Sequence, residues 1–161
     1  MADELMNNQK LIEARDTNAG RMGSAYVEID GERHFMGYLI GFEGDADIHT
    51  KDIPILGKVH DETKSTGLKQ TWSCNMYYMT SLFRRKLIEY QNTGVVFYFD
   101  VVITNRDPDS RTGEQTTVYR DCMITKMKTG KLQITDDVIE EEMSGVYRKL
   151  SMPQEFKNTL E

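Results

Sequence analysis

Five side chains in the first part of the chain could bind a metal ion. Asp45, Asp47 and His49 alternate along one stretch, and His60 and Asp61 follow in a later segment. Alternate residues of a β-strand share a face, and carboxylate and imidazole groups are common metal ligands. A metal-dependent enzyme could use such a cluster, but exposed acidic residues are also ordinary on a solvated strand face. We favour the solvated face.

A second acidic segment resembles the start of a calcium-binding loop. Asp107 and Asp109 have suitable spacing, but Arg111 stands where a third acidic ligand belongs. Gly113 also comes one position later than the glycine of that motif. The segment is therefore predicted to be a turn.

The rest of the sequence contains no recognisable catalytic motif. No serine, cysteine or histidine lies in a nucleophile signature, and neither a glycine-rich phosphate loop nor an H-E-x-x-H motif is present. Cys74 and Cys122 form no C-x-x-C pair and fall in predicted strands, which favours reduced, packed thiols. We therefore expect a protein that is not an enzyme and that needs no cofactor or metal.

Composition predicts an ordinary globular chain. Its 161 residues fit a single domain, and 39% are hydrophobic and 29% charged. The formal net charge of −6 argues against tight binding of nucleic-acid phosphates over a broad surface. No apolar run approaches the roughly 20 residues that span a bilayer, and the first residues lack the apolar core of a signal peptide. We expect a cytoplasmic protein that does not enter a membrane.

Hydrophobic periodicity predicts a mainly β fold with one α-helix. The Asp30-Gly31 pair, placed between alternating segments, is a favoured hairpin turn. A flexible arm over 1–22 is predicted to precede a single β domain over 23–161. The predicted elements of the domain, in order, are a strand over 24–29, a long strand from Arg33 to Ile48, a polar loop over about 50–67, a strand over 66–79, a helix over about 80–93, a buried strand over 95–104, a strand over 116–128 and a last strand over 138–148.

The segment from Thr66 to Gly94 changes from strand to helix periodicity. Thr80 or Ser81 can accept a hydrogen bond from the first free amides of the helix, and Gly94 ends it. The basic triplet Arg84-Arg85-Lys86 is interpreted as the solvated face of this helix. In the strand, apolar residues alternate with the polar residues Lys69, Thr71, Ser73 and Asn75.

The order of these elements resembles the tail tube (core tail) proteins of PBSX-like defective prophages and related contractile phage tails. The resemblance covers about Gly23 to Leu160 and lies in the DG hairpin, the loop IPILGKVHDETKSTG, the segment TGLKQTWSCNMYYMTSLFRRKLIEY and the strand VIEEEM. It implies a β-sandwich or barrel-like phage tail tube fold with one flanking helix. It also implies homo-hexameric rings that stack into a hollow tube inside a sheath, as in a phage tail or a tail-like bacteriocin.

The resemblance also implies which parts assemble. In that family the N-terminal arm and the loop after the second strand reach neighbouring subunits, which corresponds here to residues 1–20 and 45–66. Implied partners are further copies of the chain and the sheath, baseplate and terminator proteins, in a virion component assembled in the host cytoplasm. The candidate subunit-interface residues are Asp52, Ile53, Ile55, Leu56, Lys58, His60, Asp61 and Lys64.

Three predicted strands each have one polar face, and in a ring these faces could line a shared lumen. An acidic lining repels phosphates, so DNA could pass as cargo without binding. The candidate lumen-lining residues are Glu43, Asp45, Asp47, His49, Lys69, Thr71, Ser73, Asn75, Glu140 and Glu142, and the same alternation adds Ser144 and Arg148.

One alternative lies outside structural assemblies. A monomeric β-barrel could hold a small ligand among Trp72, Tyr78 and Tyr98. The metal-dependent enzyme built on residues 45–60 is the remaining alternative.

Overall fold

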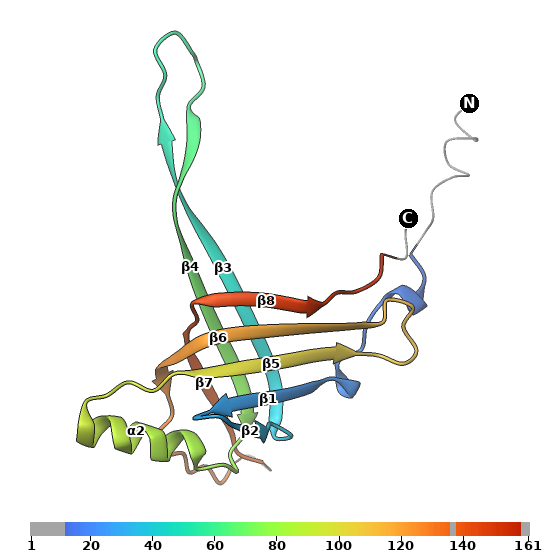
Figure 1. Ribbon diagram of the computed structural model, residues 1–161, viewed down its shortest axis with the longest axis vertical. Coiled ribbons are helices and arrows are strands. Elements are labelled where there is room, and N and C mark those ends of the chain that lie inside the picture. The colour runs from blue at the N-terminus through green and yellow to red at the C-terminus, as the bar shows by residue number, and fades with distance from the viewer. Residues whose placement is uncertain (1–11, 136–137, 159–161) are drawn as a thin grey trace. The chain divides into compact units, whose positions relative to one another are not determined.

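The computed structural model describes residues 12–135 and 138–158 and is mainly β (Figure 1). One α-helix, α2, occurs in these described ranges, as the sequence predicts. The elements are the short 3-10 turns Ala14–Asp16 and Gly20–Met22, the strands β1 (Ser24–Ile29), β2 (Glu32–Phe35), β3 (Leu39–Ile53) and β4 (Glu62–Tyr77), the helix α2 (Leu82–Thr93), and the strands β5 (Phe99–Arg106), β6 (Glu114–Met127), β7 (Glu140–Val146) and β8 (Lys149–Gln154).

The chain forms two compact units. Unit 1 combines the residues up to Gly37 with residues 100–119 and the segment from Leu150 onward. Unit 2 combines residues 38–99 and 120–149, so β6 contributes its first part to unit 1 and its second part to unit 2. The prediction of a single domain over 23–161 stays a prediction.

In unit 1, the strands are ordered β2-β1-β5-β6. The turn between β1 and β2 has Asp30 at φ 51° and Gly31 at φ 80°. Positive φ at both central residues is the signature of the hairpin turn that the Asp-Gly pair predicts. The buried apolar residues of this unit include Ala25, Val27, Ile29, Val101 and Val118.

The loop between β5 and β6 holds the described part of the N-terminal segment, which the sequence analysis predicts to be loose. The Arg111 guanidinium contacts the carboxylates of Glu13 at 3.2 Å and Asp16 at 3.1 Å. The backbone amide of Arg111 donates to the Arg15 carbonyl at 2.7 Å. Asp107 accepts from the Ala19 amide at 2.9 Å. The calcium-like motif is thus a turn, and Arg111 serves as an anchor. Residues 1–11 of the predicted arm lie outside the described residues.

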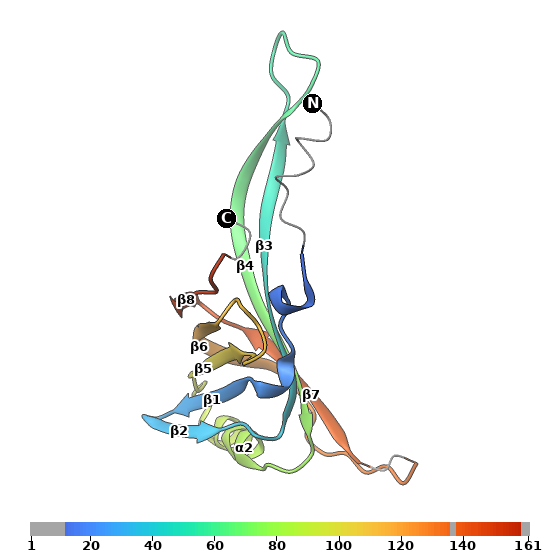
Figure 2. The ribbon, with the colours of Figure 1, turned by 90° about the vertical axis from the view of Figure 1, so that its right-hand side faces the viewer.

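In unit 2, the antiparallel strands are ordered β6-β7-β4-β3, and β4 pairs with β7 only from Thr71 to Tyr77. The outer parts of β3 and β4 therefore pair only with each other and form a projecting two-stranded arm, residues 46–70 (Figures 1 and 2). The sequence pattern predicts a loop over about 50–67, but only residues 54–61 connect the strands. Periodicity extends the strands only to Ile48 and back to residue 66, and it misses their outer ends because both faces there are largely solvated, which removes the apolar alternation.

Aromatic packing forms the core of unit 2. The Trp72 ring is only 2% exposed and stacks on Phe42 at 5.9 Å, while Phe99 meets its edge at 5.8 Å. Phe99 also contacts Phe83 of α2 at 5.9 Å, so the helix covers this side of the sheet. The helix ends at Gly94, which has φ 72° and donates its amide to the Tyr90 carbonyl. The predicted helix and its stop are confirmed.

Three strand boundaries differ from the predictions. The predicted strand from Arg33 to Ile48 is divided into β2 and β3 by a turn at Gly37, and a further strand, β8, follows the last predicted strand. The predicted strand over 95–104 begins only at Phe99, and the Val95 side chain is exposed. An apolar run alone cannot distinguish a strand from the connection that leads into it.

Candidate functional site

The three polar strand faces predicted from the sequence lie side by side in unit 2. The register places Glu43 opposite Ser73, and Ser73 opposite Ser144. Directly opposite residues of antiparallel strands point to the same face. The polar face so formed contains Glu43, Asp45, Asp47 and His49 of β3, Lys69, Thr71, Ser73 and Asn75 of β4, and Glu140, Glu142 and Ser144 of β7.

Arg148 does not join this polar face. β7 ends at Val146, whose partner on β4 is Thr71, so an apolar side chain takes the last position. The Arg148 guanidinium lies 4.9 Å from the centre of the Tyr98 ring, and it donates to the Tyr98 hydroxyl at 3.2 Å. Arg148 is therefore used in a local contact beyond the end of β7.

The polar face is less acidic than the sequence analysis predicts, because β6 adds a lysine. A register shift in β6 separates Ile124 from Lys126, which places Lys126 opposite Ser144 and Met127 opposite Met143. An extra residue in one strand exchanges the faces of the residues that follow it. Thr125 is that residue, and no periodicity in the sequence reveals it.

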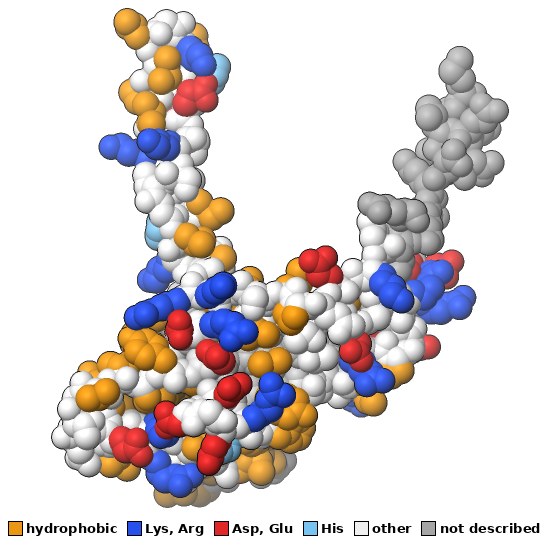
Figure 3. Space-filling model, viewed as in Figure 1, with side chains coloured by type: hydrophobic (Ala, Val, Ile, Leu, Met, Phe, Trp, Pro, Cys, Tyr) orange, Lys and Arg blue, Asp and Glu red, His pale blue; other side chains and the backbone are white. Residues whose placement is uncertain are grey.

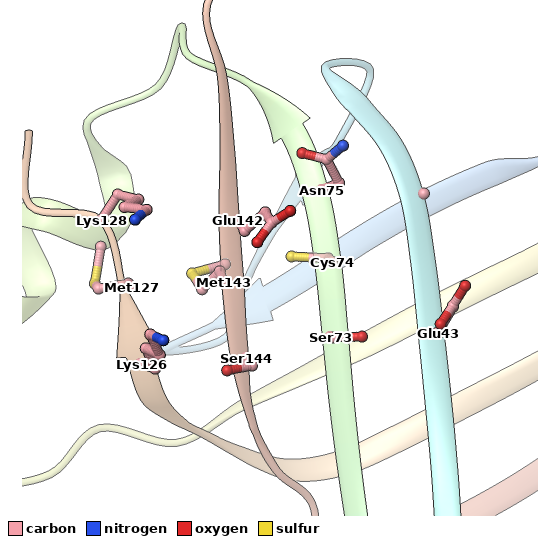
Figure 4. A pocket seen from close by; sticks show the side chains of 11 residues that line it. Glu43, Ser73, Cys74, Asn75, Lys126, Met127, Lys128, Glu142, Met143 and Ser144 are labelled. Carbon is pink, nitrogen blue, oxygen red and sulfur yellow. The ribbon is translucent and has the colours of Figure 1, made fainter. Parts of the chain in front are cut away.

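The polar face is hollowed where β3, β4, β6 and β7 meet. The hollow has a volume of about 400 Å³. Carboxylates and ammonium groups both line it, from Glu43, Glu142, Lys126 and Lys128 (Figure 4). A lining of mixed sign is suited to a wet surface, and it offers no single-sign site for a tightly bound ion.

The opposite face of the sheet contains a buried ion pair that the sequence analysis misses. Glu141 of β7 is 6% exposed, and its carboxylate accepts from the Arg84 guanidinium of α2. Arg84 also donates to the Thr80 carbonyl at 2.6 Å and lies over the Tyr78 ring at 4.2 Å. Arg84 is thus a packed contact of α2 and not part of its solvated face. Alternation in β7 could have identified Glu141, which shares the core face with Met143.

Burial controls the titration of the groups near this pair. Desolvation raises the pKa of Glu141, and the Arg84 charge opposes that rise. Desolvation, together with the nearby Glu141, raises the pKa of Cys74 to about 12. Cys122 is also a buried free thiol. Both predicted packed thiols are confirmed, and Cys74 is a poor nucleophile at neutral pH.

The candidate interface residues lie on the arm and its connecting loop. Lys58 pairs with Glu62 at 2.7 Å, and the Thr63 hydroxyl donates to Asp52 at 2.9 Å. Leu56 and Val59 are fully exposed. The other predicted residues, Ile53, Ile55, His60, Asp61 and Lys64, lie on the same projecting hairpin.

The alternative sites gain no support from the geometry. In the described residues, no group of three His, Cys, Asp or Glu side chains is arranged to hold a metal ion, although Asp45, Asp47 and His49 share a face. Trp72 is enclosed in the core, while Arg84 covers Tyr78. Among the described residues, no helix has the length and apolar character of a membrane span.

Solved structures of low sequence identity share this fold. A chain of the sixfold-symmetrised baseplate of the anti-feeding prophage is 10% identical, with a TM-score of 0.64 over 89% of this chain and 95% of that chain. A chain of the sheath-tube complex of an extracellular contractile injection system, in its extended state, is 12% identical, with a TM-score of 0.57 over 94% of this chain and 97% of that chain. The predicted tail tube fold is confirmed.

Sequence comparison identifies relatives of similar length. The phage-like element PBSX protein XkdM and the protein YqbM, both of Bacillus subtilis (strain 168), are each 24% identical over 148 residues, which is 92% of this chain and 98% of the relative. The family model described as "Phage tail tube protein" matches residues 10–154. The resemblance to PBSX-like tail tube proteins is confirmed, and the chain belongs to the phage tail tube protein family, whose members are structural subunits of the tail tube.

Proposed function

We propose that copies of this chain assemble into hexameric rings that stack into the hollow inner tube of a contractile phage tail or tail-like particle. The observation that carries the proposal is the polar face of β3, β4 and β7, which is continuous across three strands and backed by an apolar core. In a closed ring, this face lines the channel and the apolar face stays inside the wall.

Strand β3 supports ring closure. It is the terminal strand of the described part of unit 2, so one of its edges is open to a further strand. An open edge is a template for pairing with another chain, and a closed ring removes it. The charged residues Asp45, Asp47 and Lys51 occupy alternate positions of β3. They disfavour pairing of this edge with unrelated strands and favour a neighbour of defined sequence.

The arm provides contacts between subunits. The interface residues predicted from the sequence lie on it, namely Asp52, Ile53, Ile55, Leu56, Lys58, His60, Asp61 and Lys64. A projecting two-stranded hairpin is marginally stable by itself, and exposed apolar residues at its end are stabilised by burial against a partner. We assign these residues to contacts with neighbouring copies of the chain.

The complexes that contain the similar solved chains suggest the assembly partners of this chain and its place of assembly. The similar solved chains come from a sheath-tube complex, a baseplate and a sheath/tube terminator. We propose the corresponding sheath, baseplate and terminator proteins as partners here, and the host cytoplasm as the place of assembly. Hexameric symmetry is consistent with a gene transfer agent tail refined with C6 symmetry.

We also propose that the subunit has no catalytic activity. Tyr38, Cys74, Glu141 and Tyr147 are groups with clearly shifted pKa values in the described part of the chain, and desolvation raises the pKa of each. Each group is thus held in its protonated form or in an ion pair, which suits packing. The polar face carries lysines as well as carboxylates, so it offers phosphates no continuous basic surface, and DNA passes without tight binding when the particle carries it.

Negative-stain electron microscopy of the purified protein over a range of concentrations tests the proposal. We expect rings or tubes to appear as the concentration rises, because assembly is driven by mass action. Limited proteolysis should cut the arm of the free subunit within 54–61 and should cut it more slowly in the assembled particle. A chain that stays monomeric at the highest concentration, with a protected arm, contradicts the proposal.

A further inference from the structure

The described N-terminal segment lies against the loop between β5 and β6. Residues 13–19 contact residues 107–112 of this loop, and both segments belong to unit 1. Figure 3 shows acidic and basic side chains close together on this part of the surface. We name residues 13–19 the strap and residues 107–112 the latch loop.

Charge holds the first half of the strap. The Arg111 guanidinium lies 3.2 Å from the Glu13 carboxylate and 3.1 Å from the Asp16 carboxylate. Asp16 also accepts from the Glu13 amide at 3.0 Å, which caps the 3-10 turn Ala14–Asp16. The turn and its attachment to the latch loop thus share the Asp16 carboxylate, so we expect them to form and break together.

Hydrogen bonds hold the second half of the strap. The Asn18 side-chain amide donates to the Thr112 hydroxyl at 2.9 Å, and the Ala19 backbone amide donates to the Asp107 carboxylate at 2.9 Å. The chain becomes tightly packed only at Gly23, where a Cβ atom would lie 3.0 Å from a backbone carbonyl oxygen of β5. The residues before Gly23 therefore depend on the latch loop, whereas β1 does not.

The strap buries no apolar side chain. In the described stretch 12–23 every residue except Asp16 is exposed, and the side chains of Ile12 and Met22 are 69% and 62% exposed. Burial of apolar surface is the main source of tertiary stability, whereas ion pairs near the surface contribute little and are screened by salt. The strap is therefore held less firmly than β1, whose alternate residues are buried.

The latch loop also holds the segment that follows β8. The Lys157 amide donates to the Thr112 carbonyl at 2.8 Å. The side chain of the same threonine contacts Asn18 of the strap, so Thr112 connects the N-terminal and C-terminal segments of unit 1. Loss of the strap therefore removes support from the residue that holds Lys157.

We propose that the strap and the latch loop form a salt-sensitive latch. The strap opens as a unit when its contacts with Arg111 are screened or are replaced by another carboxylate, while β1 and the sheet of unit 1 stay folded. Opening exposes the Arg111 guanidinium and loosens the C-terminal segment. The latch is a property of the single chain, so the inference goes beyond the proposed function and does not depend on it.

Hydrogen exchange measured by mass spectrometry tests the latch on the full chain, at a concentration too low for assembly. Peptides that cover the strap, β1 and residues 155–158 are compared in dilute salt and in about 1 M NaCl, which shortens the screening length to about 3 Å. We expect exchange in the strap to accelerate roughly tenfold in high salt, because exchange reports local opening. Residues 155–158 should accelerate less, and β1 should not change.

Arg111→Ala should give the same fast exchange in the strap at low salt, and salt should then have little further effect. The matched control is Arg106→Ala, which removes a guanidinium from the same β5–β6 hairpin. Arg106 pairs with Glu114 at 3.1 Å, outside the strap, so this variant should behave like the wild type. Arg111→Lys should be intermediate, since an ammonium group cannot hold two carboxylates as the guanidinium fork does.

Three outcomes overturn the inference. They are a strap whose exchange responds neither to salt nor to Arg111→Ala, equal acceleration by Arg106→Ala, and acceleration of β1 together with the strap, which would mean that unit 1 opens as a whole. Each concerns the free chain and leaves the proposed function intact. A chain that shows the expected exchange but never forms rings supports the latch and contradicts the proposed function.

Discussion

Gly145 is the residue that allows β6, β7 and the Trp72 ring to pack together. A Cβ atom at this position would lie 1.8 Å from the Met123 carbonyl oxygen and 2.9 Å from Cζ2 of Trp72. The Trp72 indole also donates to the Val146 carbonyl at 3.1 Å, so the ring cannot move away without losing that bond. The clash is with the backbone of the next strand, and a side-chain rotation cannot relieve it.

Gly145→Ala is therefore expected to reduce the free energy of unfolding by about 3 kcal/mol, because overpacking forces backbone shifts. Urea unfolding followed by tryptophan fluorescence measures the change. Gly130→Ala is the matched control, since a Cβ there meets nothing within 4 Å. Equal stability of the two variants would show that the strands adjust to a methyl group.

Cys74 provides a second prediction at the residue scale. With its pKa raised to about 12 by burial, the thiol forms almost no thiolate near neutral pH. We expect Ellman's reagent to label the native chain roughly 100-fold more slowly than the urea-unfolded chain, because thiolate and access are both required. Rapid native labelling would mean that this part of the core opens readily. The Leu56→Cys variant, which adds an exposed thiol, is the positive control.

At the scale of elements, the ion pair between Arg84 and Glu141 attaches α2 to β7. The side chains are 17% and 7% exposed, so loss of one partner leaves the other poorly solvated. Arg84→Ala should reduce the free energy of unfolding by about 3 kcal/mol, whereas Arg84→Met with Glu141→Leu should cost less. Chemical denaturation of the three variants and the wild type measures both effects. A double variant less stable than Arg84→Ala would contradict the expected order.

The same pair gives a pH dependence with a definite sign. Desolvation raises the folded-state pKa of Glu141, so the folded chain binds this proton more tightly than the unfolded chain does. Its contribution to stability is therefore greatest below the unfolded pKa and is lost as pH rises through the folded pKa. Without the opposing Arg84 charge the shift grows, so the destabilisation by Arg84→Ala should increase between about pH 4 and about pH 7. A destabilisation that is constant over this range would exclude Glu141 as the cause.

Features that depend on local sequence can be predicted from it, whereas features that depend on strand register or on distant partners cannot. The Asp30-Gly31 hairpin, the helix that ends at Gly94 and the polar alternation of β4 depend on local chemistry and are recovered correctly. The face of Lys126 and the role of Glu141 do not follow from the sequence, since the first depends on the β6 register shift and the second on a partner 57 residues away. The outer ends of the arm strands cannot be predicted from periodicity, because both of their faces are largely solvated.

At the scale of the whole molecule, the charge of the polar face determines what the proposed channel repels. Glu43→Lys with Glu142→Lys should leave assembly intact and make assembled particles bind single-stranded DNA, with affinity that falls as salt rises. Filter binding of a labelled oligonucleotide at two salt concentrations measures this. The control variant Glu89→Lys with Glu155→Lys makes the same charge change on exposed carboxylates outside the polar face. Its assembled particles should bind the oligonucleotide more weakly than those of the lining variant. Equal binding by the two variants would contradict the assignment of the lining.

Trp72 is the single tryptophan of the chain, and it lies in the core of unit 2. Its emission is thus an optical reporter for one unit, whereas far-ultraviolet circular dichroism reports on the strands of both. If the shared strand β6 couples the units into one cooperative transition, the two signals should follow the same urea curve. Separate curves would mean that the wall of the particle is built from parts that can melt one at a time.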